Sequence, residues 1–262
     1  AELGKLIPQR QRSCLELTEL ALSRLEEFGP VLECVITLTP ERARNQAREL
    51  DRMLDRGEYL GPLHGIPYGA KDLLAVKGAP TTWGATPYQD QVIDETATVV
   101  RKLDQAGAVM VAKLTLGALA WGDVWFRGKT RHPWNLDEGS SGSSAGSASA
   151  VAAGLVPFAI GTETWGSIVS PSNRCGVTGL RPTFGRVSRA GAMALSWSMD
   201  KIGPIARSAA DCAMVFDVIR GPDRRDPTTV DVPFAYRHDQ TLDGLRIGYL
   251  KSAFDQDYPG KE

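Results

Sequence analysis

The first sixty residues carry the spacing of apolar positions expected of two amphipathic helices. A capping box at Ser13-Cys14-Leu15-Glu16 predicts where the first helix begins. Its apolar positions recur at helical spacing, at Leu17, Ala21, Leu25 and Phe28. The second helix is predicted to begin at Thr39-Pro40, because proline fits the first helical position. Its apolar positions are Ala43, Ala47, Leu50 and Leu54.

Farther along the chain, helical patterns alternate with short apolar runs. Residues 96–107 are predicted to form a helix that ends at Gly107, and residues 108–112 a buried strand. The same order recurs at residues 148–154 and 155–160. A second capping box begins at Ser208 and opens a helix that runs to Ile219, and residues 245–250 form the last predicted strand. This alternation predicts an α/β fold, in which helices cover both faces of a sheet.

Composition and charge narrow the class of partner. The chain has 262 residues, of which 42% are hydrophobic and 23% charged, as in ordinary globular proteins. Its 30 basic and 31 acidic residues leave a net charge of −1, so neither nucleic acid nor an anionic membrane is expected as a partner. The uncharged stretch at residues 139–162 contains Pro157 and is predicted to be a buried helix and strand, because a membrane span needs about 20 predominantly apolar residues.

The cysteines and histidines are scattered along the chain. The cysteines, which lack CxxC spacing, are Cys14, Cys34, Cys175 and Cys212. They are predicted to be reduced and buried, as in a cytoplasmic protein, and the N-terminal residues lack the apolar core of a signal peptide. The three histidines do not cluster, so we expect no zinc site, and no motif calls for a cofactor.

Three segments carry residues suited to nucleophilic chemistry. Lys71 follows an apolar run at residues 66–70, a run of Gly, Ser and Ala fills residues 139–147, and Ser167 lies farther on. Amide hydrolysis needs a nucleophile, a base, an acid for the leaving amine and donors for the oxyanion. A serine hydroxyl needs a nearby base at neutral pH. Burial lowers the pKa of a lysine from its free value of ~10.4, so a buried lysine can be that base.

Four blocks of the chain together resemble the amidase signature family. They are residues 65–72, 141–147, 161–168 and 175–183. Ser143 precedes Ser167 by 24 positions, which is the family's spacing between a relay serine and its nucleophile. The resemblance runs from the first predicted helix to the run near Leu245. It implies the amidase signature fold, a mixed β-sheet covered by α-helices on both faces.

The resemblance also implies roles for individual residues. Ser167 would be the acyl-accepting nucleophile, Ser143 would relay its proton and Lys71 would be the final base. A cis peptide bond after Gly142 would hold Ser143. The backbone N–H groups of four consecutive residues would form the oxyanion hole, namely Thr164, Trp165, Gly166 and Ser167. The implied reaction is cofactor-independent hydrolysis of a small-molecule amide, by an enzyme that could be a homodimer.

The chain departs from the family pattern at three positions. Trp165 stands where the family mostly has glycine, and its indole is expected to narrow the acyl pocket from a normal backbone conformation. Glu163 and Val169 replace the usual Asp and Arg, so the ion pair between those positions is expected to be lost or rerouted.

The resemblance also predicts how the chain is organised. We expect one domain over residues 1–262, with N-terminal helices at 1–60, a catalytic core at 61–220 and the start of a C-terminal half at 221–262. The rest of that half is absent from the sequence, so the chain is predicted to be part of a longer protein, incomplete at the C-terminus.

Three other readings remain open from the sequence. Residues 142–146 fit the G-x-S-x-G elbow of α/β-hydrolases, with Ser144 as nucleophile and His238 as the only downstream histidine for a triad. That elbow must follow a buried strand, whereas a polar, Pro-containing segment precedes these residues. The chain could be the amide-transferring A-type subunit of a tRNA-dependent amidotransferase, although residues 114–127 do not resemble the run typical of those subunits. It could also be a non-catalytic paralogue, against which the retained Lys71, Ser143 and Ser167 argue.

Overall fold

The computed structural model describes residues 2–237 and 241–255. Its α-helices are α1 (Leu3–Leu6), α2 (Cys14–Leu32), α3 (Pro40–Asp55), α4 (Thr98–Gln105), α5 (Ala145–Ala152), α6 (Val169–Cys175), α7 (Ala209–Ile219) and α8 (Lys251–Phe254). The strands of the main sheet are β1 (Val35–Leu38), β2 (Pro67–Lys71), β3 (Val109–Leu114), β8 (Phe158–Glu163), β9 (Thr178–Gly179) and β10 (Lys201–Ala206). Two small hairpins consist of β4 (Val124–Trp125) with β5 (Gly128–Lys129), and β6 (Arg131–His132) with β7 (Asn135–Gly139).

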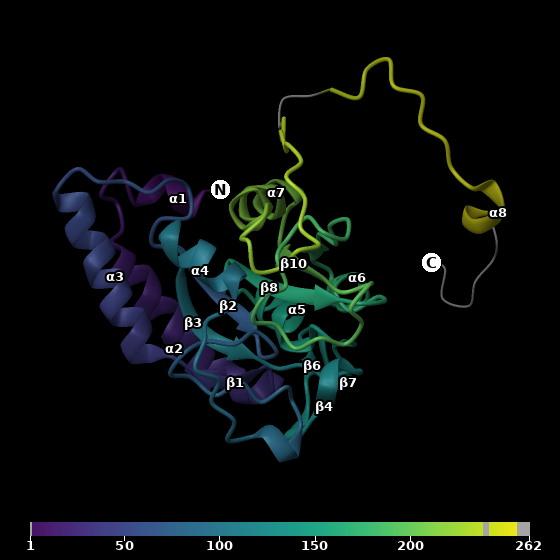
Figure 1. Ribbon diagram of the computed structural model, residues 1–262, viewed down its shortest axis with the longest axis horizontal. Helices are drawn as coiled ribbons and strands as arrows, with labels where there is room; N and C mark the ends of the chain where they lie inside the picture. The colour runs from purple at the N-terminus through teal and green to yellow at the C-terminus, as the bar shows by residue number, and fades with distance from the viewer. Residues whose placement is uncertain (1, 238–240, 256–262) are drawn as a thin grey trace.

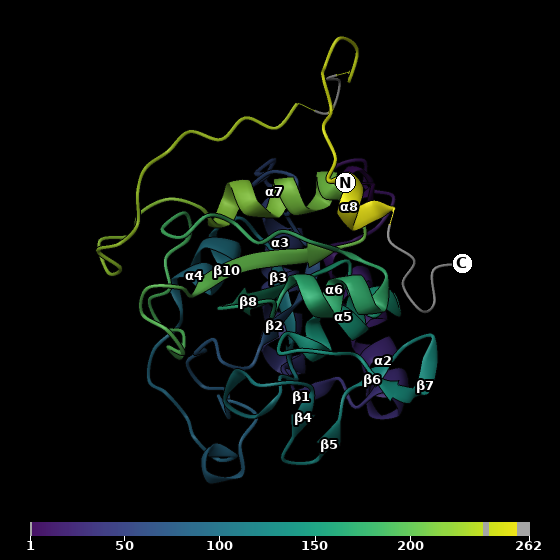
Figure 2. The ribbon, with the colours of Figure 1, turned by 90° about the vertical axis from the view of Figure 1, so that its right-hand side faces the viewer.

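The sheet is mixed, with the strand order β1-β3-β2-β8-β10-β9. Strand β2 runs parallel to β3 and to β8, whereas the pairs β1–β3, β8–β10 and β10–β9 are antiparallel. Figures 1 and 2 show α2 and α3 on one side of this sheet and α5 and α6 on the other, with α7 beside β10. The predicted α/β architecture with helices on both faces is therefore confirmed.

The two N-terminal helices begin where the sequence predicts. Ser13 and Glu16 form both hydrogen bonds of the capping box, and Pro40 is the first residue of α3. The apolar positions predicted for the two helices are buried except for Phe28, whose side chain is 37% exposed. Gly29 and Leu32 continue the buried face of α2, and Phe28 lies beneath the Arg24 guanidinium at its edge. Phe28 thus marks the edge of the buried face of α2.

The central strands are those that the alternation predicts, although one of them begins later in the chain than predicted. Strand β3 is buried over its whole length, as expected of a strand covered on both faces. The strand predicted at residues 155–160 is β8, which begins after Pro157, a residue with no N–H for the ladder. The helix predicted after Ser208 is α7, and the Ser208 side chain accepts a hydrogen bond from the Asp211 N–H at its start.

The strand predicted at residues 245–250 was wrong, since the structure has no strand there. Leu245, Ile247, Tyr249 and Leu250 are all at least half exposed. Figure 1 shows this segment leading away from the sheet to the short helix α8. An alternating apolar segment forms a strand only where it can pair with a neighbouring strand and pack against a core. This segment contacts neither the sheet nor the core.

No helix within residues 2–237 and 241–255 is both long enough and apolar enough to cross a membrane.

Candidate active site

Strand β2 places Lys71 at its carboxyl end, inside the protein. The strand is buried along its length, and the Lys71 side chain is fully buried. Its Nζ atom lies within hydrogen-bonding distance of four oxygens. These are Ser143 Oγ at 2.8 Å, Thr162 Oγ1 at 2.9 Å, Ser144 Oγ at 3.1 Å and the Thr162 carbonyl at 3.3 Å. Lys71 therefore connects β2 to β8 and to the N-terminus of α5.

The surroundings of Lys71 favour its neutral form. Burial lowers the pKa of Lys71 well below its ordinary value of 10.5, although the charges of Asp200 and Glu163 oppose this shift. Within the described chain, the oxygens that contact Nζ belong to hydroxyl and carbonyl groups, not to carboxylates. A neutral amine has a lone pair and can accept the proton of the Ser143 hydroxyl.

Ser143 is held by an unusual stretch of backbone. The peptide bond between Gly142 and Ser143 is cis, as the resemblance implied, and Ser141 has a positive φ of 63°. A Cβ atom at Gly142 would lie 1.8 Å from the carbonyl oxygen of Gly122, so only glycine fits there. This packing fixes the backbone next to Ser143 and leaves its hydroxyl against Lys71.

Ser144 is a structural neighbour of Lys71 and not an exposed elbow serine. Its side chain is fully buried, and its hydroxyl donates to the Thr162 carbonyl while accepting from the Thr162 N–H. The strand before it, β7, belongs to a hairpin with a mostly exposed surface and is not part of the main sheet. The α/β-hydrolase reading with Ser144 as nucleophile was therefore wrong. His238, its candidate partner, lies outside the described residues.

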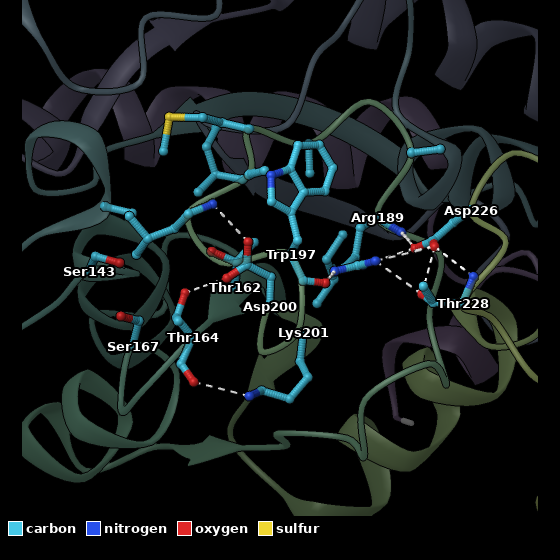
Figure 3. A pocket seen from close by; sticks show the side chains of 18 of the residues that line it. Ser143, Thr162, Thr164, Ser167, Arg189, Trp197, Asp200, Lys201, Asp226 and Thr228 are labelled. Carbon is cyan, nitrogen blue, oxygen red and sulfur yellow. Dashed lines mark hydrogen bonds and ion pairs between the residues drawn. The ribbon is translucent and has the colours of Figure 1, made fainter.

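Ser167 lines a cavity of about 290 Å³ together with Ser143, Thr162 and Thr164. We call this space the Ser167 cavity. Figure 3 shows Ser143 and Ser167 next to one another on one side of it. The Ser144 N–H donates to the Ser167 carbonyl at 3.0 Å, which ties the start of α5 to the Ser167 loop. The structure thus brings Lys71, Ser143 and Ser167 together from three distant parts of the chain.

Glu163 organises the loop of the predicted oxyanion hole. The backbone N–H groups of Ile168 and Val169 donate to Glu163 Oε2 at 2.8 and 2.9 Å, and Gly166 has a φ of +90°. Burial alone would raise the pKa of the Glu163 carboxyl, but these backbone hydrogen bonds lower it. The ion pair of Glu163, expected to be lost or rerouted because residue 169 is valine, is rerouted to Arg181. Arg181 Nη1 lies 3.5 Å from Glu163 Oε1.

Trp165 does not narrow the cavity. Its φ lies outside the positive region, as expected, but its side chain is 84% exposed and does not line the Ser167 cavity. The expected effect of the indole on the acyl pocket was therefore wrong. The tryptophan that does line the cavity is Trp197, from the loop before β10.

Sequence reasoning missed two residues that hold the site together. Thr162 contacts Lys71 through both its hydroxyl and its carbonyl, and it lies inside the block around Ser167 that the resemblance had already marked. Asp200 accepts a hydrogen bond from Thr164 Oγ1 at 2.5 Å and others from the N–H groups of Leu195 and Ser196. No spacing signal in the sequence marks Asp200, because its partner Thr164 becomes a neighbour only when β10 pairs with β8.

Among the residues that the structure describes, no three His, Cys, Asp or Glu side chains gather as a metal site would require.

Comparison with known proteins agrees with this geometry. A sequence profile of the amidase family matches residues 16–261. The chain belongs to the amidase signature family. Among its curated relatives, the A-type subunit of the glutamyl-tRNA(Gln) amidotransferase of Methylococcus capsulatus is 45% identical over 98% of this chain and 54% of its own length. The corresponding protein of Moorella thermoacetica is 41% identical over 97% of this chain and 53% of its own length.

Solved structures of amidases share the fold. The peptide amidase of Stenotrophomonas maltophilia is 40% identical with a TM-score of 0.84, over 90% of this chain and 50% of the amidase. A bacterial aryl acylamidase of the amidase signature family is 31% identical with a TM-score of 0.82, over 89% of this chain and 49% of its own. The chain thus spans about half the length of these relatives.

Proposed function

We propose that this protein cleaves amide C–N bonds with Ser167 as the nucleophile, through an acyl-enzyme intermediate. The observation that carries the proposal is the 2.8 Å contact between Lys71 Nζ and Ser143 Oγ, next to a cavity that Ser167 also lines. A buried lysine with hydroxyl and carbonyl neighbours can be a base, and a serine between it and the nucleophile can carry the proton.

The steps follow from these positions. Ser167 Oγ attacks the amide carbonyl carbon and gives its proton to Ser143, while the Ser143 proton passes to Lys71. When the C–N bond breaks, the proton returns through Ser143 to the leaving amine, and Ser167 keeps the acyl group. Water then attacks the ester by the same route and releases the acid. In each half Lys71 begins and ends neutral.

The developing oxyanion needs donors that are in place before the reaction. The backbone N–H groups of residues 164–167 are the proposed donors, on a loop that Glu163 holds from one end. Asp200 and Lys201 hold the other end, through the Thr164 hydroxyl and carbonyl respectively. Because fixed dipoles need no reorganisation during the reaction, removal of one such donor typically costs about 10²–10³ in kcat.

A second candidate is the A-type subunit of a tRNA-dependent amidotransferase. The curated relatives at 45% and 41% identity carry that name and favour it. The likeness to a peptide amidase at 40% identity and to an aryl acylamidase favours hydrolysis by a free-standing amidase. Both candidates use the same amide cleavage at Ser167 and differ in the substrate and in the acceptor of the nitrogen.

The proposal includes a cytoplasmic location, a small-molecule amide as substrate and a cofactor-independent reaction. Cys14, Cys34, Cys175 and Cys212 are free thiols, which suits a reducing compartment.

Trapping the acyl group with hydroxylamine tests the proposed intermediate. An acyl-enzyme partitions between water and hydroxylamine, so two amides that share an acyl group but differ in the amine should give one ratio of hydroxamate to acid. A ratio that changes with the leaving amine, or no hydroxamate while hydrolysis proceeds, would rule out the intermediate.

A further inference from the structure

The Ser167 cavity has an apolar side that the proposed chemistry does not use. Most of its apolar lining comes from β10, from the loop before it and from the turn after β2. The larger apolar side chains among these residues are Leu73, Met193, Leu195, Trp197 and Ile202. A substrate bound at Ser167 therefore faces a hydrophobic wall inside the same cavity.

The two arginines that line the cavity are already paired by the protein. The Arg189 guanidinium donates to the Asp226 carboxylate from Nε at 2.9 Å and from Nη2 at 3.3 Å. Arg225 pairs with Glu95 at 2.5 Å. In Figure 3 the Arg189–Asp226 pair lies on the opposite side of the cavity from Ser143 and Ser167. Both guanidinium groups therefore already have a carboxylate partner.

The other two charged residues of the lining hold the oxyanion loop. The Asp200 carboxylate accepts from Thr164 Oγ1 and from the N–H groups of Leu195 and Ser196. The Lys201 ammonium donates to the Thr164 carbonyl at 3.0 Å. A charged substrate group that pulled either residue toward itself would compete with a hydrogen bond that positions the loop of the proposed oxyanion hole.

Trp197 presents an aromatic surface to the cavity. Its backbone carbonyl accepts from Arg189 Nη1 at 2.6 Å, whereas its side chain is 80% exposed. Figure 3 shows its indole between the serines and the Arg189–Asp226 pair. An indole can cover a large apolar area of a ligand at little entropic cost, because its side chain has only two rotatable bonds. The wall and this indole are therefore suited to an aliphatic or aromatic chain.

We propose that the Ser167 cavity selects an uncharged, apolar acyl chain and disfavours acyl chains that carry a carboxylate or an ammonium group. This inference rests on the proposed function, because it assumes that the acyl group is transferred to Ser167. A charged acyl chain would lose water, and each charged side chain of this lining already makes an ion pair or a hydrogen bond within the protein. The free amino acid glutamine, whose acyl chain carries both charges, is accordingly a poor substrate of this cavity.

Ammonia release from three primary amides tests the selection. Primary amides are used because the leaving ammonia is small, so only the acyl chain can fill the cavity. The probes are octanamide, the monoamide of octanedioic acid, which has the same chain length and a terminal carboxylate, and glutamine. We expect kcat/KM for octanamide to exceed that for either charged amide by about a hundredfold.

Variants of the wall show whether this cavity makes the selection. Trp197→Ser should lower kcat/KM for octanamide about tenfold and lower that for acetamide much less, because acetamide is too short to use the wall. Leu195→Arg should raise kcat/KM for the octanedioic monoamide relative to octanamide, since Leu195 is half exposed and tolerates a charge. Trp134→Ser is the matched control, because Trp134 is 72% exposed and does not line the cavity.

The outcomes separate this inference from the function it rests on. Equal turnover of octanamide, its carboxylate analogue and glutamine would overturn the selection and leave the amide cleavage standing. A preference for octanamide that Trp197→Ser and Leu195→Arg do not change would also overturn it, because the selection would then lie elsewhere. Absence of ammonia release from all three amides and from acetamide would overturn both proposals.

Discussion

Lys71 Nζ and Ser143 Oγ lie 2.8 Å apart, and both side chains are closed off from solvent. Burial lowers the pKa of Lys71 well below 10.5. Since the proposed base must be neutral, activity should be lost as the pH falls through that lowered pKa. A pH profile of kcat/KM checks this, with its acidic limb centred below pH 10.5.

Lys71→Arg should be inactive at every pH, because a guanidinium does not deprotonate. Near-normal activity of that variant would exclude Lys71 as the base.

Glu163 should affect turnover more than binding. Glu163→Ala removes the acceptor of the Ile168 and Val169 N–H groups, so the oxyanion donors should lose their alignment. We expect kcat to fall by about 10²-fold with little change in KM. Glu163→Gln, which keeps an acceptor oxygen, should fall less.

Arg181→Ala is the control for Glu163. Arg181 also contacts the carboxylate, but its side chain is 52% exposed and its pairing should contribute little. A Glu163→Ala variant with the kcat of the parent, or an Arg181→Ala variant as impaired as Glu163→Ala, would show that the loop is held in another way.

The buried ion pair between Lys113 and Asp72 should be important for the stability of the fold. Both side chains are fully buried, and Asp72 also accepts from the Thr82 N–H and hydroxyl. Lys113→Met leaves the Asp72 charge unpaired and should lower the free energy of unfolding by about 3–5 kcal/mol. Urea denaturation measures this. Adding Asp72→Asn to Lys113→Met should recover part of the lost free energy of unfolding. If the loss in the double variant equals the sum of the losses in the two single variants, the pairing is contradicted.

Asp226 should make stability depend on pH in the acidic range. Burial opposes the shift, but hydrogen bonds from Arg189 and Thr228 hold the pKa of Asp226 well below its ordinary value. The stability it contributes is therefore fully present above the unfolded-state pKa of about 3.9, and is lost as the pH falls toward the lower folded-state value. Asp226→Asn should be less stable at neutral pH and should lose less stability than the parent as the pH falls below about 4. An identical acid dependence in parent and variant would contradict this assignment.

How far the sequence predicts the structure depends on whether the deciding contact is local. The capping box at Ser13, the N-cap hydrogen bond at Ser208 and the apolar face of α3 need only neighbouring residues, and they are as predicted. The segment at residues 245–250 has a strand-like pattern but no strand beside it, and no local signal reveals that.

The candidate site shows the same division. The resemblance located Lys71, Ser143 and Ser167, and the structure brings them together. It could not show that Trp165 points to solvent and Trp197 lines the cavity, because side-chain direction is set by the path of the loop. Asp200 was missed for a related reason, since its hydrogen bond to Thr164 follows from the pairing of β10 with β8.

Labelling with a fluorophosphonate tests the central claim most directly. The reagent phosphonylates an activated serine, and mass spectrometry of the digested protein locates the modified residue. We predict modification of Ser167 in the parent, none in Ser167→Ala, and unchanged modification in Ser170→Ala, whose serine lies nearby and pairs with Ser141 instead. Lys71→Met should slow the labelling strongly. Equal labelling of the parent and of Ser167→Ala would contradict the assignment of Ser167 as the nucleophile.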